Sequence, residues 1–341
     1  MSTVLLTGVN GFVAATILQK LLARGHTVVG TVRSESKTKY IREQHKAAVS
    51  ADKLKFAIVD DITVPGAFDE VLRQYQFDTV LHTSSPFHFN VTDIAKELYE
   101  PAVQGTTSIL ESIHKVAPSV KRVVLTSSFA SVVDRSQGNR PGKIYTEADW
   151  NPTTSEEGLK DVVSGYYASK KLAETAAWDF MKEKNPSFTL TALCPPMVYG
   201  PPEQEVQSMN KLNTSDLEIY NIFNGGPIPS NGVWIWVDVR DLAEAHVLAI
   251  DAPAAANQRY ITAQGNYSFQ MFADYMWKNY PERAAAKGLD KGNPGKYYPD
   301  DGNYGVDNSK SVKELGLKYT SVDDMLRDTL KKFEELEAEG K

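Results

Sequence analysis

The chain has 341 residues, of which 42% are hydrophobic and 23% are charged, and its formal net charge is −6. These values are typical of globular proteins and argue against a disordered or fibrous chain. The mild acidity and the lack of a long basic run argue against nucleic acid as a partner.

The single cysteine, Cys194, leaves no partner for an intramolecular disulfide. Residues 1–8 contain no basic segment and only a short apolar run, and no stretch of 18 apolar residues occurs in the sequence. We therefore expect a cytoplasmic protein without a membrane span.

The first 200 residues alternate between short apolar segments and amphipathic ones. The apolar segments are rich in Val, Leu and Ile and predict buried parallel strands at 4–7, 27–33, 54–59, 79–82, 122–126 and 188–194. Between the strands, the pattern predicts helices at 13–24, 67–75, 93–114 and 166–184. Because strands alternating with helices form βαβ units, we expect an α/β fold with a Rossmann-type, doubly wound parallel sheet.

The pattern changes after Gly200, where a polar stretch begins that continues to about Gly232. It is followed by an aromatic strand, a helix, a short strand and two helical segments near the C-terminus, the first three at 233–239, 242–250 and 259–262. We therefore divide the chain into a Rossmann domain at 1–200 and a smaller C-terminal α/β lobe at 201–341. Some C-terminal elements are expected to return to the large domain.

The strand predicted at 4–7 runs directly into a turn that opens a helix. Glycines lie three residues apart in this turn, whose members are Gly8, Asn10, Gly11, Phe12 and Val13. Glycine at such a turn lets the backbone approach a pyrophosphate closely, and the helix N-terminus offers free N–H groups to the anion. This context favours dinucleotide binding over an ordinary tight turn.

The end of the second predicted strand indicates which dinucleotide binds. NAD-binding folds usually place an acid there to hold the ribose 2′-hydroxyl, whereas this chain has Arg33, with Lys37 one turn further on. A guanidinium suits a 2′-phosphate, which favours NADPH/NADP+ as the cofactor. The alternative is a solvated basic loop whose charge is reduced by Glu35.

Tyrosine and lysine occur four residues apart near the start of the helix predicted at 166–184. Such a pair lies on one helix face. A neighbouring ammonium, together with the positive nicotinamide ring of the oxidised cofactor, favours the phenolate and lowers the tyrosine pKa from about 10. The tyrosine then serves as the proton donor to a carbonyl oxygen. Two registers fit, Tyr166 with Lys170 and Tyr167 with Lys171, and geometry alone does not separate them.

Several segments together resemble a known family. They are residues 7–13 (TGVNGFV), 80–87 (VLHTSSPF), 122–128 (RVVLTSS), 166–170 (YYASK) and 237–243 (VDVRDLA). On these motifs the chain resembles the extended short-chain dehydrogenases/reductases, in the branch of the dihydroflavonol reductases and the yeast methylglyoxal and carbonyl reductases. The resemblance covers nearly the whole chain.

The resemblance implies which residues form the site. The family motif of tyrosine, two spacers, serine and lysine fits only Tyr166 with Lys170, and Ser128 matches the serine that binds the substrate carbonyl. Further cofactor contacts implied by the resemblance are Asp61, Ile62, Thr83, Ser84, Ser85, Ser127, Pro195, Met197 and Val198. Cys194 replaces the asparagine that the family often has, and we interpret it as a small buried side chain.

The activity implied by the resemblance is NADPH-dependent reduction of aldehydes and ketones to alcohols. The six histidines show no metal-ligand spacing, so no metal is expected. Uncharged carbonyl compounds such as 2-oxoaldehydes, diketones and keto esters suit the apolar pocket that we expect from Phe87, Phe129, Val133, Val163 and Tyr199. Trp234 and Trp236 are further candidates for this pocket, with a place in the core as the alternative.

Other functions are compatible with the same scaffold. They are a nucleotide-sugar epimerase or dehydratase, a flavonoid reductase and a non-enzymatic NADP sensor, although Tyr166 argues against the sensor. The expected partner is a small-molecule carbonyl substrate, and the chain is expected to be a monomer or a homodimer.

Overall fold

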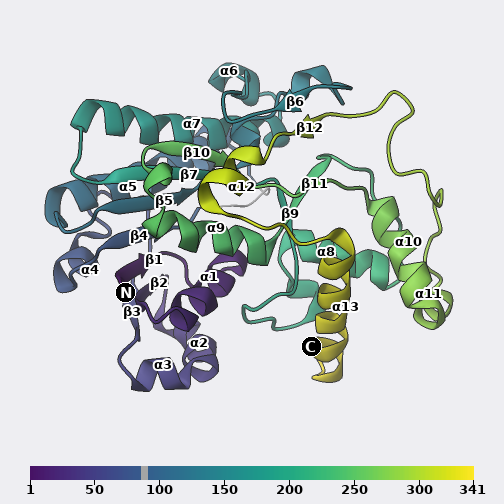
Figure 1. Ribbon diagram of the computed structural model, residues 1–341, viewed down its shortest axis with the longest axis horizontal. Helices are drawn as coiled ribbons and strands as arrows, with labels where there is room; N and C mark the ends of the chain where they lie inside the picture. Colours follow the sequence, from purple (N-terminus) through teal and green to yellow (C-terminus); the bar gives the residue numbers. More distant parts are fainter. Residues whose placement is uncertain (86–90) are drawn as a thin grey trace.

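The computed structural model describes residues 1–85 and 91–341 (Figure 1). Its centre is a seven-stranded sheet in the order β10-β7-β5-β4-β1-β2-β3, in which every neighbouring pair is parallel. The strands are β1 (Thr3–Leu6), β2 (Thr27–Val32), β3 (Leu54–Ile58), β4 (Thr79–His82), β5 (Arg122–Thr126), β7 (Thr189–Cys194) and β10 (Gln258–Ile261). The predicted Rossmann-type sheet is thus confirmed, and each strand predicted before Gly200 ends within one residue of its expected bounds.

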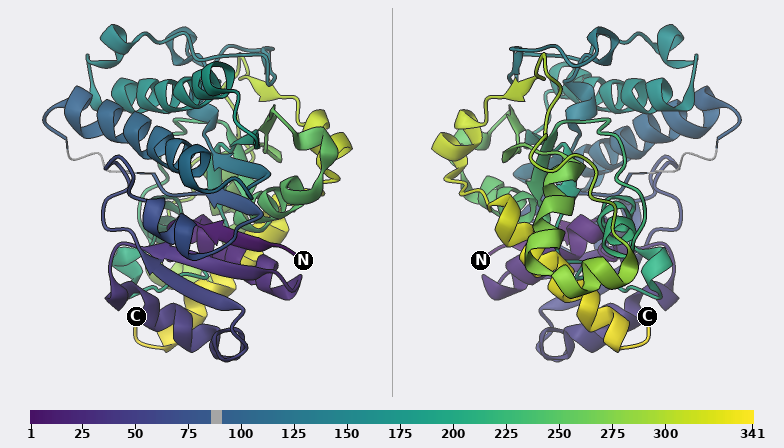
Figure 2. Two further views of the ribbon diagram at one scale, coloured as in Figure 1. Left: turned by 90° about the vertical axis from the view of Figure 1, so that its left-hand side faces the viewer. Right: turned by 90° about the vertical axis from the view of Figure 1, so that its right-hand side faces the viewer.

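Helices cover both faces of this sheet, and Figure 2 shows α5 and α7 lying side by side on one of them. The covering helices are α1 (Phe12–Ala23), α4 (Asp69–Gln74), α5 (Glu100–Val116), α7 (Val162–Lys184) and α9 (Val239–Asp251). Successive strand side chains point to opposite faces. In β1, Val4 and Leu6 pack in one core with α1 and α9, whereas Leu5 packs in the other core with α4, α5 and α7.

The order of the strands creates a switch point between β1 and β4. From β1 the chain continues outward through β2 and β3, and from β4 it continues the other way through β5. Doubly wound sheets bind their ligands at such a point, beyond the carboxyl ends of the strands. The segments that follow β1 and β4 meet there, because Thr7 Oγ1 accepts hydrogen bonds from the backbone N–H groups of Thr83 (3.0 Å) and Ser84 (3.1 Å).

Local interactions shift some helix boundaries from those predicted. Helix α7 begins four residues early because the Asp161 carboxylate caps it, accepting a hydrogen bond from the Ser164 N–H (2.9 Å). The helix expected at 93–114 divides into a π-helical turn (Ala95–Tyr99) and α5. The remaining short elements of the large domain are α2 (Thr38–Gln44), α3 (Lys46–Ser50), β6 (Ile144–Tyr145), α6 (Ser155–Gly158) and the 3-10 helices Glu35–Lys37, Phe129–Ser131, Arg135–Gln137 and Pro253–Ala255.

The smaller lobe has its own sheet and an aromatic core, and it lies at the opposite end of the molecule from β3 (Figure 1). Its three-stranded sheet has the order β11-β9-β8. Its elements are β8 (Met197–Tyr199), the 3-10 helix Met209–Lys211, α8 (Thr214–Phe223), β9 (Ile235–Asp238), β11 (Gly265–Asn266), α10 (Phe269–Asn279), α11 (Pro281–Lys287) and α13 (Val322–Ala338). In the described part of the chain, no helix has the length and apolar character of a membrane span.

The lobe is not one continuous stretch of sequence. The strand expected at 259–262 is β10, which pairs with β7 in the main sheet, and the helix expected at 242–250 is α9, which packs on α1. Helix α12 (Ser309–Leu315) likewise packs on β10 and α9, and β12 (Gly305–Val306) pairs with β6. The chain therefore crosses between the two parts several times after Gly200.

A buried ion pair joins α7 to β10. Arg259 Nε donates to Glu174 Oε1 at 2.5 Å, and both side chains are almost fully buried. Arg259 also donates to the carbonyl oxygens of Glu147 (2.8 Å) and Asp149 (2.9 Å), and its guanidinium lies 3.7 Å from the centroid of the Trp150 ring. These contacts satisfy a charge that would otherwise be costly to bury.

Removing one member of this pair is expected to destabilise the protein strongly. Glu174→Ala leaves Arg259 buried without its anion, and the expected loss in the free energy of unfolding is about 3–5 kcal/mol, measured by urea denaturation. Glu183→Ala, which removes an exposed carboxylate from the same helix, serves as the control. It should change the free energy of unfolding by less than about 0.5 kcal/mol. Equal stability of the two variants would show that the pair contributes little.

Candidate active site

The turn after β1 forms a backbone cradle. Gly8 has a φ of +65°, and a Cβ atom there would lie only 2.7 Å from Ser84 Oγ, so this position requires glycine. Helix α1 starts after Gly11, with no side-chain cap and no acid in its first turn. Its first N–H groups are therefore available to an anion, and this geometry fits the pyrophosphate of a dinucleotide.

A cavity of about 300 Å³ extends from this cradle toward the ends of β2 and β3. Arg33 and Lys37 line it, and both are exposed. The Glu35 carboxylate pairs with Arg42 (3.3 Å), so it does not neutralise either cation. The remaining lining residues are Gly8, Asn10, Gly11, Thr31, Val32, Val59, Ile62, Thr83, Ser84 and Ser85. Two cations beside the end of β2 fit a 2′-phosphate.

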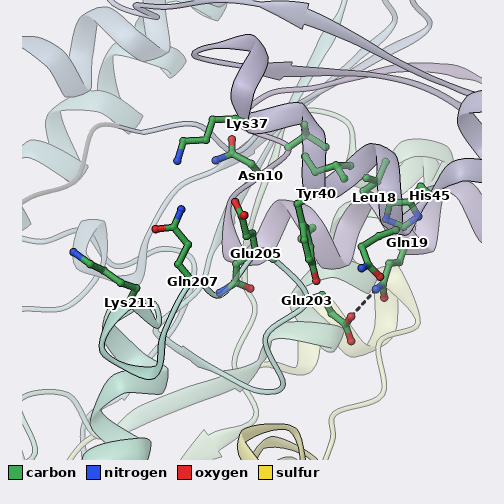
Figure 3. Close-up of a pocket in the computed structure, with 15 residues that line it drawn as sticks. Asn10, Leu18, Gln19, Lys37, Tyr40, His45, Glu203, Glu205, Gln207 and Lys211 are labelled. Atoms are coloured by element: carbon green, nitrogen blue, oxygen red, sulfur yellow. Dashed lines mark hydrogen bonds between the residues drawn. The ribbon is translucent and has the colours of Figure 1, made fainter. Parts of the chain in front are cut away.

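A second cavity, of about 260 Å³, lies between α1, α2 and the lobe segment 203–211 (Figure 3). Asn10 and Lys37 line both this cavity and the nucleotide cavity. Gln19 on α1 donates a hydrogen bond to the Glu203 carboxylate (2.7 Å), which holds the segment against the large domain. The smaller lobe thus lines a cavity that adjoins the nucleotide cavity at Asn10 and Lys37.

The largest of these cavities, about 730 Å³, lies between the sheet edge and the smaller lobe. Tyr166 and Lys170 of α7 line it, and the Ser128 side chain lies close enough to the Tyr166 phenol to lower its pKa. Lys170 Nζ donates to Ser85 Oγ (2.7 Å) and lies 5.5 Å from the centroid of the Tyr166 ring. Two of the three residues expected to be catalytic, Tyr166 and Lys170, therefore line one cavity, and Ser128 lies beside Tyr166.

Burial shifts the pKa of both ionisable groups of this pair. It raises the pKa of Tyr166 to about 12, although the hydrogen bond from Ser128 opposes this rise, and it lowers the pKa of Lys170 to about 8. The sequence predicted that the ammonium would lower the tyrosine pKa. In the structure, desolvation of the phenol is the largest cause of its pKa shift, and Lys170, whose Nζ donates to Ser85 Oγ, is not among the causes.

The second register, Tyr167 with Lys171, does not form a pair of this kind. Lys171 Nζ donates to the carbonyl oxygen of Thr153 (3.0 Å), away from the cavity. Tyr167 is almost fully buried and packs with Arg135, whose guanidinium carbon lies 4.7 Å from the Tyr167 ring centroid. The structure thus favours Tyr166 with Lys170, as the family motif implied.

The prediction of the residues that form the pocket wall is partly wrong. Phe129, Val133 and Tyr199 are at most 1% exposed and lie in the cores of the two parts rather than on the cavity surface. Trp236 is also core, and the Trp234 indole donates to Asn139 Oδ1 (2.9 Å). Phe87 lies outside the described residues. Val163 lines the cavity as expected.

Ser127 also differs from the expectation. Its hydroxyl donates to Glu174 Oε2 (2.5 Å) in the buried ion-pair network, so its side chain is not available to a cofactor. Cys194 lies beside the same carboxylate and is buried, as expected, and burial raises the pKa of its thiol to about 12.

Only some of the other expected cofactor contacts line the nucleotide cavity or the cavity of about 730 Å³. Met197, Val198 and Ile62 line them, whereas Asp61 and Pro195 do not. The Asp61 carboxylate instead accepts hydrogen bonds from Thr63, and these hold its pKa below the usual range.

Sequence reasoning missed several residues of the cavity wall. Arg135 contributes from the 3-10 helix after β5, and the smaller lobe contributes Asn213, Thr214, Ser215, Glu218, Gly232 and Val233. These residues carry no recognisable motif, and only the folded chain brings them to Tyr166. Within the described ranges, no cluster of three or more His, Cys, Asp or Glu side chains is arranged to hold a metal ion.

A glycine-lined helix N-terminus at the switch point of a parallel sheet places the chain in the class of Rossmann-type dinucleotide-binding proteins. The match to a family model over residues 4–262 is more specific: the chain belongs to the NAD dependent epimerase/dehydratase family. This confirms the resemblance inferred from the motifs.

The relatives include reductases of similar length. Ketoreductase azaE of Aspergillus niger is 39% identical over 336 residues, 96% of each chain. The NADPH-dependent methylglyoxal reductase GRE2 of Saccharomyces cerevisiae is 36% identical over 337 residues, again 96% of each chain. The crystal structure of Gre2 from Candida albicans in complex with NADPH has a TM-score of 0.89 and 35% identity, covering 98% of this chain and 99% of that one.

Proposed function

We propose that this protein reduces aldehydes and ketones to alcohols with NADPH, and that Tyr166, Lys170 and Ser128 are its catalytic residues. The observation that carries the proposal is that Tyr166 and Lys170 line one cavity together with Gly8 and Gly11 of the cradle after β1. That cavity shares Gly8, Gly11 and other residues with the nucleotide cavity. Several relatives are named as NADPH-dependent reductases, which supports the same function.

The residues divide the chemistry between them. Bound NADPH supplies the hydride that reaches the carbonyl carbon. Ser128 and Tyr166 donate hydrogen bonds to the carbonyl oxygen, and the phenol proton moves from Tyr166 Oη to the forming alkoxide. The ammonium of Lys170 stabilises the phenolate that remains and relays a proton from water to it, which restores the phenol. A phenol pKa of about 12 keeps Tyr166 protonated at neutral pH, ready to donate.

The nucleotide-sugar epimerase or dehydratase is the main alternative, since the family contains such enzymes. Arg33 stands where an NAD-binding relative would be expected to have an acid, which favours the reductase. The preferred carbonyl substrate, a cytoplasmic location and a monomeric or homodimeric state stay predictions from the sequence.

Tyr166→Phe is expected to reduce kcat by at least about 100-fold, because it removes the proton donor. The measurement is the loss of NADPH absorbance with a panel of small ketones and aldehydes, run beside NADH. Tyr167→Phe is the matched control and should keep most of its activity on uncharged ketones. Bound NADPH, followed by its fluorescence, should be retained in both variants. Equal turnover by the two variants, or no turnover of any carbonyl by the unmodified protein, would contradict the proposal.

The pH profile should follow Lys170. Its ammonium form is present below a pKa of about 8 and is lost above it, so kcat/KM for reduction should be flat near neutrality and fall as the pH rises through about 8. The value of kcat/KM is chosen because it reports the groups of the free enzyme. Lys170→Met should have low activity without this fall. The Lys171 ammonium lies outside the cavity, so Lys171→Met should keep the fall in kcat/KM. If the fall survives in Lys170→Met, another group causes it.

Arg33→Asp tests the choice of cofactor. Replacing a cation with an anion beside the 2′-phosphate should raise KM for NADPH by about 10- to 100-fold, the range expected when a charge-assisted hydrogen bond is lost. The KM for NADH should change much less. Lys39→Asp makes the same charge reversal on α2 at an exposed residue that lines no described cavity, and it should leave both values nearly unchanged. An unchanged KM for NADPH in Arg33→Asp would refute the assignment.

A further inference from the structure

The catalytic cavity contains a cation that the proposed mechanism does not use. Among the described residues that line it, three are charged: Lys170, Arg135 and Glu218. Lys170 belongs to the catalytic machinery. Most of the remaining cavity surface is apolar, and Arg135 places a second cation on it.

Arg135 lies near the proton donor. Its guanidinium carbon is 4.7 Å from the centroid of the Tyr167 ring, and the Tyr167 and Tyr166 ring centroids are 5.8 Å apart with the rings nearly perpendicular. A single aromatic ring therefore separates the guanidinium from the ring of Tyr166. Because Arg135 and Tyr166 line the same cavity, a substrate whose carbonyl oxygen reaches Tyr166 can also contact Arg135.

The backbone that carries Arg135 is well fixed. Arg135 is the first residue of a 3-10 helix capped by Asp134, whose carboxylate accepts a hydrogen bond from the Ser136 N–H (3.0 Å). The Asp134 N–H in turn donates to the hydroxyl of the buried Tyr145 (3.0 Å). The guanidinium is thus presented to the cavity by an anchored turn.

The nearby carboxylates are engaged elsewhere. Asp134 forms an ion pair with Arg140 (3.3 Å), and Asp161 caps α7. Hydrogen bonds from Ser164, and to a smaller extent the charge of Arg135, hold the pKa of Asp161 below its usual range. Within the described residues, no carboxylate lies within ion-pair distance of Arg135. Its charge therefore remains available to a ligand.

Glu218 does not cancel this charge from within the cavity. Its carboxylate accepts a hydrogen bond from the Tyr199 hydroxyl (3.2 Å), which in turn is hydrogen-bonded to Tyr267 (2.9 Å) in the core of the smaller lobe. Burial raises the pKa of Glu218. With Lys170 and Arg135 against the one carboxylate of Glu218, the described lining carries more positive than negative charge.

We infer that Arg135 is a specificity-determining residue that binds a carboxylate of the substrate, so that the enzyme favours oxo acids over their neutral esters. A guanidinium and a carboxylate form a charge-assisted, directional pair. The inference rests on the proposed carbonyl reduction and adds a substrate class to the uncharged carbonyl compounds expected from the sequence. Because Arg135 is exposed, solvent screens the pair and its effect should be moderate.

The test compares a matched substrate pair, 4-oxopentanoate and its methyl ester, in the full-length protein with NADPH. Arg135→Gln should lower the ratio of kcat/KM for the acid to that for the ester by at least about fivefold, mainly through a higher KM for the acid. Arg135→Lys should keep part of the preference, and added salt should weaken it in the unmodified protein. Arg73→Gln, which removes the same charge from α4, should leave the ratio unchanged.

The possible failures are distinguishable. An unchanged ratio in Arg135→Gln, with the ester still reduced, overturns the inference and leaves the proposed function intact. Equal losses for both substrates, with a raised KM for NADPH, overturn it in favour of a contact to the cofactor. If neither member of the pair is reduced, the assay becomes competitive inhibition by pentanoate of the reduction of an uncharged ketone. Weaker inhibition of Arg135→Gln than of the unmodified protein supports the inference, and equal inhibition overturns it. Only the absence of any carbonyl reduction would contradict the proposed function.

Discussion

The buried ion pair of Glu174 and Arg259 holds the elements that carry the proposed catalytic residues relative to one another. Tyr166, Lys170 and Glu174 follow at intervals of four on α7, so they share one helix face. Glu174 accepts the hydrogen bond of Ser127 and lies within reach of Ser131, and these two residues flank Ser128. Arg259 reaches the same carboxylate from the last strand of the sheet. The network thereby joins three parts of the chain, which are helix α7, strand β10 and the turn that follows β5. A buried network rather than a free loop therefore places Ser128 beside Tyr166.

Desolvation connects this architecture to the chemistry. The same burial that raises the pKa of the Tyr166 phenol lowers that of the Lys170 ammonium, because both charged forms lose water. The two pKa values thus shift in opposite directions, and both shifts suit reduction. The phenol remains protonated, and the ammonium can release its proton near neutral pH. A contribution from Lys170 to the acidity of Tyr166 would have to act on the phenolate formed during turnover, when the negative charge is present for the ammonium to stabilise.

Much of the fold and of the cofactor site could be predicted because it depends on local patterns. Buried parallel strands are continuous apolar runs, and the cradle at Gly8 depends on backbone geometry that only glycine adopts easily. The membership of β10 in the main sheet was missed because pairing with β7 is a long-range property that a four-residue strand does not reveal. Phe129 and Val133 were misplaced for a related reason: proximity to Ser128 in sequence does not tell which side chains turn toward the cavity and which toward the core.

The two halves of the site are therefore built on different principles. The residues proposed for hydride and proton transfer follow β1 and β5 or lie on α7, where the sheet and the buried network hold them. The substrate wall is assembled from the turn that carries Arg135, from α8 and from the segment that precedes β9, which are far apart in sequence and contribute through individual side chains. A change in that wall need not disturb the network around Glu174. This separation makes the charge on the wall, rather than the proposed catalytic residues, the part of the site that can change while the network stays intact.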